Sequence, residues 1–476
     1  MRRDVVLGID SSTQATKVVA VDVETGAVIG EGRAPHSGAD VQDPNDWWDA
    51  LITATRLAVP SGTRVVGLSV AGQQHGCVTI DETGAPVRPA PLWNNVASAP
   101  EAERLNEQAD FAAEVGTRLV ASFTITKLAH LARTAPDALA RTAAVGLPHD
   151  WLNFKLTGAL ASDRGDASGS GWWSPREGRD RRDLLALAVG SDAAARLRLP
   201  EVRGPNEPAG TLSAGAAAEL GLPAGIPVGA GTGDNMAAAL GIGAEPGEVV
   251  VSLGTSGTVY AVTSEPTADE TGEICGFADA TGRFLPLACM LNCTRVVDTV
   301  ARMFGMDLEV ALDRAAAAPF GAAGLTMTPY LAGERTPNLP TATGTILGLT
   351  AATATLDLFL RAALEGVAAG LSYCVDALER LGLTGTTVTL VGGGSAHRAW
   401  RQVIADVIGV PVVLRGGGEH AARGAAIQAA AIVRGEPIID LVAHWRPEVI
   451  GVVEPNMEHH DRFVRRQTAG ISEARG

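Results

Sequence analysis

The stretch VVLGIDSSTQATKVVAVDVETGAVI at residues 5–29 decides the fold. Residues 5–9 are an apolar run, and the polar turn at residues 10–14 leads into a second apolar run at residues 17–23. A Glu-Thr-Gly turn then precedes a third apolar segment at residues 27–29. The pattern predicts three short strands in a row, joined by tight turns.

A helix and a fourth strand are predicted next. Residues 46–59 place Trp47 and Leu51 at helical spacing, and Asp46 suits a helix start. The apolar segment RVVGLSVA at residues 64–71 is typical of a buried strand reached by such a crossover. Three meandering strands, a helix and a further strand are the opening of a ribonuclease H-like, or actin-like, domain.

The second half of the chain repeats this order of elements. Strands and helices alternate there in the same way, with strands at residues 248–253, 258–262, 283–290 and 386–391, and helices at residues 292–304, 356–381 and from about His397. Two similar turns, DSSTQ at residue 10 and SLGTSG at residue 252, lie roughly 240 residues apart, which favours a duplicated domain over a solenoid. We expect domains over residues 1–245 and 246–440, followed by an extension at 441–476.

Composition excludes several classes of function. The chain has 476 residues, 46% of them hydrophobic, and a net charge of −15, which argues against binding to nucleic acid or to anionic membranes. None of the three lysines, Lys17, Lys127 and Lys155, precedes Ser or Thr, so a Walker A loop is excluded. Five cysteines do not suggest a disulfide framework, and Asp10 interrupts any signal segment. We expect a folded cytoplasmic protein with reduced thiols.

The two similar turns can each be interpreted in two ways. In the first, backbone N–H groups and the hydroxyls of Ser12 and Thr13 could hold phosphate oxygens while Asp10 holds magnesium through its waters. The alternative is an Asx- or Ser/Thr-turn that only stabilises a hairpin. The turn at Gly254 and Thr255 has the same two interpretations, but the occurrence of both in matching contexts favours phosphate binding.

Three further segments carry polar or glycine-rich patterns. The GGGS turn at residues 392–395 lets a flat ligand approach the backbone, or it is a tight strand-to-helix connection. Asp234, in GTGDN, is either a helix cap or a carboxylate that takes a proton from an alcohol. Gln74 and His75, in GQQHG, suit hydrogen bonding to a polyhydroxy ligand, although a lone His is often structural.

Taken in order, these motifs resemble the FGGY carbohydrate kinases, and among them the xylulokinase-like members. The resemblance covers nearly the whole chain. The segments that carry it are GIDSSTQ, AGQQHG, LWNN, FTITKL, LPHDWL, GTGDN, SLGTSGT, PYLAGERTP and LVGGGS, which begin at residues 8, 71, 92, 123, 147, 231, 252, 329 and 390. The resemblance implies two actin-like domains with an interdomain catalytic cleft, and the reaction of D-xylulose with ATP to give D-xylulose 5-phosphate and ADP.

The resemblance also implies a role for each site residue. Asp234 would be the general base, with Gln74, His75 and Asn235 holding the ketose, and Asp10 would assist magnesium. The nucleotide would contact hydroxyl and glycine positions in both halves of the chain, namely Ser12, Thr13, Gly254, Thr255, Gly392, Gly393, Gly394 and Ser395. The implied cofactors are ATP and Mg²⁺, and a homodimer is the assembly that the family suggests.

The chain departs from the family pattern in three places. Asn95 and Ala97 stand where family members commonly carry Asp and Arg, and His130 stands where a tryptophan is usual. The first loop has Ser11 and Ser12 where many relatives have a glycine. These changes leave two alternatives open. One is an FGGY kinase for another ketose or polyol. The other is a non-catalytic protein of actin-like fold, such as a nucleotide-driven chaperone or a sugar sensor.

Overall fold

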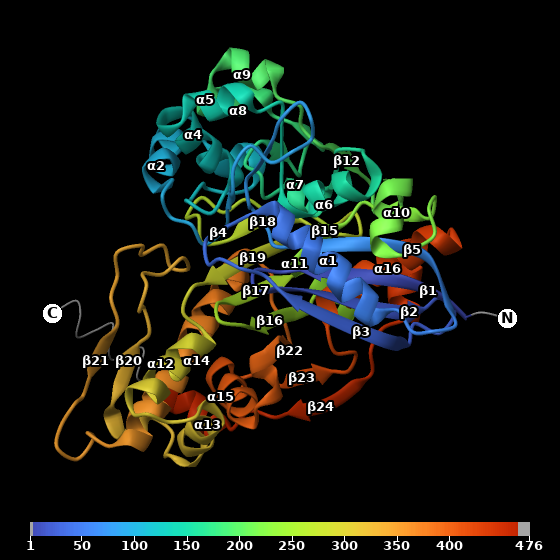
Figure 1. Ribbon diagram of the computed structural model, residues 1–476. Coiled ribbons are helices and arrows are strands. Elements are labelled where there is room, and N and C mark those ends of the chain that lie inside the picture. Colours follow the sequence, from blue (N-terminus) through green and yellow to red (C-terminus); the bar gives the residue numbers. More distant parts are fainter. Residues whose placement is uncertain (1–2, 465–476) are drawn as a thin grey trace. The chain divides into compact units, whose positions relative to one another are not determined.

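The computed structural model describes residues 3–464, in which two compact units can be distinguished (Figure 1). Unit 1 combines the chain up to Ala244 with Ser264–Leu285 and Gly417–Pro447. Unit 2 consists of Glu245–Thr263, Pro286–Gly416 and the described residues from Glu448 onward. These units group residues by contact, and the domain limits proposed from the sequence stay a prediction.

A mixed sheet forms the centre of unit 1. Its strands are bonded in the order β13, β14, β5, β1, β2 and β3, and β15 also pairs with β5. Strand β2 runs antiparallel to its neighbours β1 and β3, whereas β5 runs parallel to β1 and β14 parallel to β5. The strands are β1 (Arg3–Ser11), β2 (Ala15–Asp22), β3 (Val28–Pro35), β5 (Thr63–Gly72), β13 (Pro208–Thr211), β14 (Pro227–Gly229) and β15 (Thr232–Gly233).

The sequence of β1 explains its central position. Alternate side chains of a strand point to opposite faces, and Val5, Leu7 and Ile9 enter one apolar core together with Trp47 of helix α1 (Pro44–Ala58). The other face is covered by helix α16 (His420–Arg434). A Cβ atom at Gly8 would lie 1.8 Å from the carbonyl oxygen of Ala422, so only glycine allows this helix to approach the strand.

The remaining elements of unit 1 are mostly short. Helices α4 and α8 lie side by side and contact α2, α5 and α9 (Figure 1). The helices are α2 (Ala99–Gln108), α3 (Phe111–Val115), α4 (Thr124–Thr134), α5 (Pro136–Arg141), α6 (Pro148–Thr157), α7 (Arg164–Ala167), α8 (Arg182–Val189), α9 (Ser191–Arg196), α10 (Ala214–Leu220), α11 (Asp234–Ile242) and α17 (Ile438–His444). The other strands are β4 (Val41–Gln42), β6 (Val78–Ile80), β7 (Ala90–Pro91), β8 (Ala144–Gly146), β9 (Ala161–Asp163), β10 (Trp173–Ser174), β11 (Arg179–Asp180), β12 (Glu201–Arg203) and β18 (Cys275–Ala278).

Unit 2 is built on a second mixed sheet. Six of its strands follow the order β19, β17, β16, β22, β23 and β24, with β22 and β23 parallel to β16. They are β16 (Val249–Leu253), β17 (Gly257–Ala261), β19 (Phe284–Met290), β22 (Val388–Val391), β23 (Val412–Arg415) and β24 (Val449–Val453). The other elements are α12 (Thr294–Met303), α13 (Leu308–Ala317), α14 (Leu356–Arg380), α15 (Arg398–Ile408), η1 (Ala322–Gly324), η2 (Gly393–Ala396), β20 (Thr326–Thr328) and β21 (Thr345–Leu347).

Helix α14 is long and apolar enough to cross a membrane by length and composition alone. However, 78% of its most apolar window is buried inside the fold. Burial of this extent is typical of a core helix, which must be apolar on most of its surface. Side chains such as Leu360, Leu364 and Leu371 are fully buried, so α14 is the core helix of unit 2.

The predicted order of strands and helices agrees with the structure in both halves of the chain. The prediction that Asp46 starts the first helix is wrong. Helix α1 begins at Pro44, and the side chain of Asp43 accepts a hydrogen bond from the backbone N–H of Asn45, 2.9 Å away. Proline is favoured in the first turn because its missing N–H would have no partner there, and this moves the start two residues earlier than Asp46.

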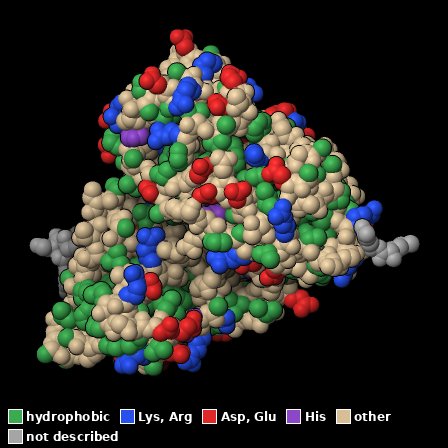
Figure 2. Space-filling model, viewed as in Figure 1, with side chains coloured by type: hydrophobic (Ala, Val, Ile, Leu, Met, Phe, Trp, Pro, Cys, Tyr) green, Lys and Arg blue, Asp and Glu red, His purple; other side chains and the backbone are tan. Residues whose placement is uncertain are grey.

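The distribution of surface charge and the state of the cysteines can be compared with the expectations from composition. On the face shown in Figure 2, Lys and Arg side chains are interspersed with Asp and Glu rather than gathered in one basic patch. All five cysteines are free thiols, and four of them are buried. Cys289 and Cys293, which form the C-x₃-C motif, are therefore not bonded to each other.

Candidate active site

Polar residues collect where the central strands of unit 1 end. In the register of the sheet, Asp10 of β1 and Thr232 of β15 both lie opposite Ala71 of β5, on its two sides. Because these strands are parallel, the segments that follow them leave the sheet at the same edge. Those segments are the Asp10 turn, the GQQHG loop and the start of α11 at Asp234.

Asp10 lies buried at this edge with an unusual environment. Its Oδ1 atom has no hydrogen-bond partner, and its Oδ2 atom is 3.9 Å from Nζ of Lys17. Burial raises the pKa of Asp10 to about 6, partly offset by Lys17, which itself pairs with Glu419 at 2.6 Å. A buried carboxylate oxygen without a partner is costly, so this atom is available to a cation or its bound water.

The hydroxyls next to Asp10 are held by their surroundings. The Oγ atom of Ser12 donates to the carbonyl of Ala15 at 3.2 Å, and Trp93 donates from Nε1 to Oγ1 of Thr13 at 3.0 Å. Both residues are only partly buried. The Asp10 turn therefore has the Ser/Thr-turn contacts of the structural interpretation, and it also leaves Thr13 accessible as the phosphate interpretation requires.

Asp234 is the first residue of α11, and the residue as a whole is partly buried. Its Oδ1 atom accepts hydrogen bonds from the backbone N–H of Asn235 at 2.8 Å and from the side-chain amide of Asn235 at 2.9 Å. Gly233 occupies the N-cap position, so the helix-cap interpretation of Asp234 does not hold. The carboxylate is fixed by its neighbour rather than used to start the helix.

The charges around Asp234 favour its protonated form. Burial is the main cause that raises the pKa of Asp234 to about 7, and the carboxylates of Asp10 and Asp166 raise it further. The two hydrogen bonds from Asn235 act in the opposite direction. A carboxylate with a pKa near 7 is suited to accept a proton at neutral pH, because a general base is most effective when its pKa lies near the pH at which it works.

Two of the residues predicted to bind the sugar, Asn235 and Gln74, are connected to Asp234 by hydrogen bonds. Asn235 donates from Nδ2 to Oε1 of Gln74 at 3.0 Å, and the buried Nε2 of Gln74 has no partner. His75 has a φ of 64°, which is rare for a residue with a side chain. Its Nδ1 lies 2.9 Å from the carbonyl oxygen of Gly169, and because that oxygen only accepts, Nδ1 carries the proton. The structure thus brings Gln74, Asn235 and Asp234 together.

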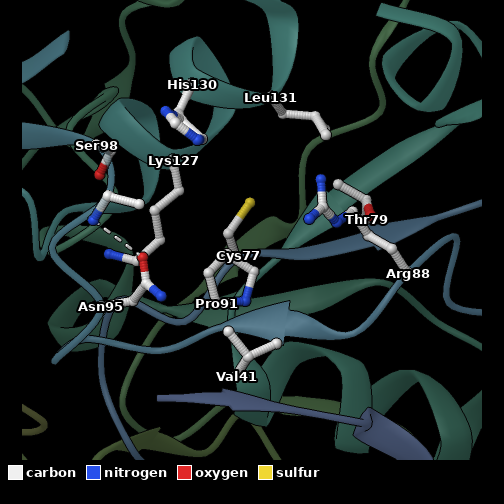
Figure 3. A pocket seen from close by; sticks show the side chains of 11 residues that line it. Val41, Cys77, Thr79, Arg88, Pro91, Asn95, Ser98, Lys127, His130 and Leu131 are labelled. Atoms are coloured by element: carbon white, nitrogen blue, oxygen red, sulfur yellow. Dashed lines mark hydrogen bonds between the residues drawn. The ribbon is translucent and has the colours of Figure 1, made fainter. Parts of the chain in front are cut away.

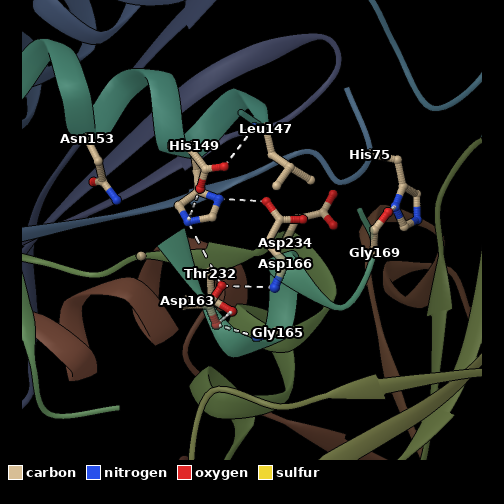
Figure 4. A network of polar contacts seen from close by, with 12 residues as sticks. His75, Leu147, His149, Asn153, Asp163, Gly165, Asp166, Gly169, Thr232 and Asp234 are labelled. Atoms are coloured by element: carbon tan, nitrogen blue, oxygen red, sulfur yellow. Dashed lines mark hydrogen bonds and ion pairs between the residues drawn. The ribbon is translucent and has the colours of Figure 1, made fainter. Parts of the chain in front are cut away.

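Behind Asp234 lies a buried charged network (Figure 4). His149 of α6 is fully buried, and its Nδ1 is 2.6 Å from Oδ2 of Asp166. Its Nε2 lies 3.3 Å from Asp150 and 3.9 Å from Asp163. Burial alone would lower the pKa of His149, but these carboxylates raise it to about 9. The imidazolium therefore compensates the charge of a cluster that acts on Asp234 through the negative charge of Asp166.

The same region fixes the backbone that leads to Asp234. Asn153 donates to the carbonyl of Ala230 at 2.6 Å, and Gln428 bonds both backbone groups of Gly231. Thr232 donates from Oγ1 to Asp163 at 2.7 Å. Three successive residues before Gly233 are held by side chains from three different elements, which limits the positions that the Asp234 carboxylate can adopt.

Sequence reasoning missed this network. His149 was quoted only as part of a family motif, and Asp163 and Asp166 were not singled out. The spacing of Asp163 and Asp166 is that of a helix cap, and Asp163 indeed accepts from the backbone N–H of Asp166 at 2.9 Å. The sequence held no signal that pairs these carboxylates with an imidazole from α6, because that contact depends on the packing of two separate helices.

In unit 2, the predicted nucleotide residues lie at the ends of two neighbouring parallel strands. Ser252 near the end of β16 pairs with Val391 at the end of β22. Thr255, in the turn after β16, is exposed, and Gly254 is partly exposed. The first residue of α12 fixes this turn, because Thr294 donates from Oγ1 to the carbonyl of Gly254 at 2.7 Å.

The glycine turn after β22 leaves backbone accessible. Gly392 has a φ of 84°, and a Cβ atom there would lie 2.7 Å from the carbonyl oxygen of Leu253. Gly394 also packs against Leu253, whereas a Cβ atom at Gly393 would meet nothing within 4 Å. Ser395 donates from Oγ to the carbonyl of Gly392 at 2.7 Å. The turn therefore combines the tight connection of the structural interpretation with an open backbone face at Gly393.

Two of the departures from the family pattern, the Asn95 and Ala97 pair and His130, meet at one place. Asn95, Ala97 and His130 all line a cavity of about 110 Å³ in unit 1, together with Cys77 and Lys127 (Figure 3). Asn95 donates to Asp40 at 2.7 Å, so its amide is engaged. Cys77 lies in the wall of this cavity, two residues after His75 in the chain.

Both halves of the chain match known protein families. Two family models, for the N-terminal and C-terminal domains of the FGGY family of carbohydrate kinases, match residues 5–241 and 249–432. The chain belongs to the FGGY family of carbohydrate kinases. Membership in the FGGY family confirms the predicted two-domain α/β fold and makes the protein a phosphotransferase that acts on a sugar, with ATP implied as the phosphate donor.

Individual FGGY relatives are similar over nearly their whole length. A xylulose kinase from Streptomyces rubiginosus is 46% identical over 471 residues, which cover 96% of this chain and 95% of the relative. A xylulose kinase from Streptomyces coelicolor is 44% identical and covers 98% of this chain and 96% of its own. The crystal structure of a xylulose kinase from Bifidobacterium adolescentis, 35% identical, superposes with a TM-score of 0.84 over 98% of this chain and 99% of that one.

Proposed function

We propose that this FGGY kinase transfers the γ-phosphoryl group of ATP to D-xylulose and forms D-xylulose 5-phosphate and ADP. The names of the Streptomyces relatives support the choice of sugar. The observation that carries the proposed chemistry is the Asp234 carboxylate, held by Asn235 next to Gln74, whose Nε2 has no hydrogen-bond partner among residues 3–464. A base and two amides in contact form a suitable site for one hydroxyl of a polyhydroxy substrate.

Asp234 acts as the general base in this proposal. The sugar hydroxyl oxygen forms a bond to the γ-phosphorus, the bond from that phosphorus to the β–γ bridging oxygen breaks, and ADP leaves. The hydroxyl proton passes to Asp234. Such a base contributes about 10²- to 10⁴-fold to the rate. Its contacts with Asn235 orient it, and the network of His149 and Asp166 lies behind it.

Gln74, His75 and Asn235 hold the ketose in the proposed complex. The Nε2 group of Gln74 is a buried donor that gains a partner when a sugar hydroxyl binds. His75 is positioned by Gly169 and packs against Phe123 and Phe277, with ring centroids 4.8 and 5.5 Å away. A ring wedged in this way presents its edge in a fixed direction, which favours recognition of one sugar geometry over others.

The donor set around Asp10 fits a magnesium ion. Asp10 offers a buried carboxylate oxygen without a partner, and oxygen is the ligand type that Mg²⁺ prefers. When bound, the ion would neutralise charge on the phosphates. Ser12 and Thr13 would contact the transferred phosphate. In unit 2, Gly254 and Thr255 would contact the triphosphate, and Gly392, Gly393, Gly394 and Ser395 the adenosine.

The remaining expectations are part of the same proposal. We propose a cytoplasmic enzyme, with a homodimer as the assembly. The domains proposed from the sequence are residues 1–245 for sugar binding and 246–440 for nucleotide binding, with an extension at 441–476.

A coupled assay of ADP release over a panel of pentuloses, hexuloses and polyols tests the function. We expect D-xylulose to give the highest kcat/KM of the panel. A higher kcat/KM for another ketose or polyol would contradict the proposed sugar while leaving a sugar kinase. ATP turnover that does not depend on any sugar would contradict the proposed reaction itself.

A further inference from the structure

A cavity of about 110 Å³ lies in unit 1 beside the segment that follows His75 (Figure 3). Its walls come from the strands and turns around Cys77 and Thr79, from Arg88, and from Lys127 of α4. Apolar side chains such as Leu131 complete it. The residues assigned to the sugar and the nucleotide do not line this cavity, so the proposed function leaves it without a role.

Lys127 places a positive charge in the cavity wall. The side chain is almost fully buried, and its Nζ donates to the carbonyl of Ala121 at 2.8 Å and to that of Ser122. An ammonium group has three donors, so one N–H remains beyond these two carbonyls. Burial lowers the pKa of Lys127 to about 7, so near neutral pH its charge is only partly formed, and an anion bound beside it would favour the charged form.

No acidic side chain lines the cavity to balance its cations. Arg88 lies in the wall with an exposed side chain, and among residues 3–464 no carboxylate forms an ion pair with Arg88 or Lys127. Glu101 bonds to His130 at the wall, but it is already paired with Arg133 at 2.6 Å. Two basic side chains that face one cavity without a counter-ion leave a local positive potential.

Thr79 adds an independent indication of a ligand. The residue is 2% exposed and lines the cavity, and its Oγ1 atom has no hydrogen-bond partner. A buried hydroxyl without a partner is less stable than one that is hydrogen-bonded. A ligand that accepts a hydrogen bond here would remove that cost.

We propose that this cavity binds a compact oxyanion, held by Lys127, Arg88 and the hydroxyl of Thr79. The occupant has negatively charged oxygen atoms and a small body, as inorganic phosphate, sulfate and short carboxylates do. The anion supplies acceptors for the third N–H of Lys127, for the guanidinium and for the threonine hydroxyl.

Occupancy of the cavity affects the sugar loop in this proposal. Cys77 lines the cavity, and His75, two residues earlier, holds a backbone conformation with a φ of 64°. An anion that fixes the wall at Cys77 and Thr79 also restrains that conformation. This effect on the sugar depends on the proposed function, whereas binding of the anion does not.

Isothermal titration calorimetry of the full chain tests the binding. Inorganic phosphate and acetate are titrated in separate experiments at constant ionic strength with chloride as the balancing anion. No sugar is present, and a saturating non-hydrolysable ATP analogue with magnesium occupies the nucleotide-binding residues. We expect saturable binding of at least one of the two anions. The anion with the higher affinity shows whether the site prefers a phosphate or a carboxylate. Absence of saturable binding of both anions would overturn the proposal.

Three variants locate the binding. We expect Arg88→Gln to weaken the affinity at least about tenfold, as for loss of a charge-assisted hydrogen bond, and Thr79→Val, which keeps the shape, to weaken it about threefold or more. Arg176→Gln, at an exposed arginine in the turn between β10 and β11, is the matched control and should bind as the wild type does. Equal affinities of Arg88→Gln and wild type would overturn the proposal.

A kinetic measurement separates this inference from the proposed function. The KM for D-xylulose is measured in wild type and in Arg88→Gln over a range of concentrations of the anion that binds. We expect the anion to lower KM at least about twofold in the wild type and not in the variant. Anion binding without xylulose turnover would leave the site intact and contradict only the proposed function, whereas xylulose turnover without anion binding would contradict only the site.

Discussion

The two central sheets of this protein share one strand order and differ in the chemistry at their edges. In unit 1 the order β13, β14, β5, β1, β2, β3 matches β24, β23, β22, β16, β17, β19 of unit 2, including the antiparallel strand at one edge. Asp10 lies near the end of β1, whereas β16 has no carboxylate near its end and is followed by Gly254 and Thr255. The loop after β5 carries Gln74 and His75, where the loop after β22 has three glycines and a serine.

This difference shows how one backbone plan serves two kinds of recognition. In unit 1, charged and amide side chains at the strand ends can bind a hydroxyl group and a cation. In unit 2, glycines and the hydroxyls of Thr255 and Ser395 leave backbone N–H groups accessible, which suits phosphates and flat rings. Changes in unit 1 are therefore expected to affect chemistry, and changes in unit 2 to affect nucleotide affinity.

The largest effect is expected at Asp234. Asp234→Asn removes the proposed base but keeps a similar shape, so kcat should fall about 10²- to 10⁴-fold with little change in the KM for sugar or in folding. Steady-state kinetics and circular dichroism measure these quantities. Thr255→Ala in unit 2 is the comparison, and it should raise the KM for ATP with a smaller loss of kcat. An Asp234→Asn enzyme with a near wild-type kcat would remove this residue from the role of base.

Asp10 is expected to give the next largest effect. Asp10→Ala removes the unpartnered carboxylate oxygen, so kcat/KM for ATP should fall about tenfold or more, and the magnesium concentration needed for half-maximal rate should rise. Rates measured over a magnesium titration test this expectation. Ser252→Ala, near the end of β16 in the second sheet, is the matched change and should leave the magnesium dependence as it is in the wild type. An unaltered magnesium titration in Asp10→Ala would contradict the assignment.

The glycines of unit 2 allow a paired comparison. Gly392→Ala places a Cβ atom 2.7 Å from the carbonyl oxygen of Leu253 at a φ of 84°, so we expect a loss of about 1–3 kcal/mol in the free energy of unfolding and a raised KM for ATP. Gly393→Ala meets no atom within 4 Å and should keep the stability of the wild type. Denaturant unfolding and ATP kinetics check both variants. Equal stability of the two would show that the turn after β22 is less constrained than its geometry indicates.

The smallest effect concerns the pH dependence of the reaction. A base must be ionised to act, and because the pKa of Asp234 is raised to about 7, kcat/KM should fall as pH decreases through about 7. Asp166→Asn keeps an acceptor for His149 but removes a negative charge that raises this pKa. The acidic limb should therefore move to lower pH, by about one unit or less. A limb at unchanged pH in this variant would contradict the coupling between Asp166 and Asp234.

Local pattern was sufficient to predict much of the fold. Apolar runs that alternate with Gly- and Ser-rich turns predicted β1, β2, β5, β16 and β22, because strand length and turn chemistry are encoded in neighbouring residues. The start of α1 was predicted at the wrong residue, since Asp43 and Asp46 are both good caps and the sequence does not rank them. The gathering of Asp10, Gln74 and Asp234 could be expected from parallel strands, but not the bond between Gln74 and Asn235.

The order of strands, the two Thr-containing turns and the family to which the chain belongs follow from the sequence alone, since they depend on residues that are adjacent or regularly spaced. The pairing of His149 with Asp166 and the uncompensated Lys127 beside Thr79 were decided only by the tertiary structure. The physical reason is that burial removes water from these groups. Their charge and hydrogen bonding then depend on which distant side chains the fold brings to them.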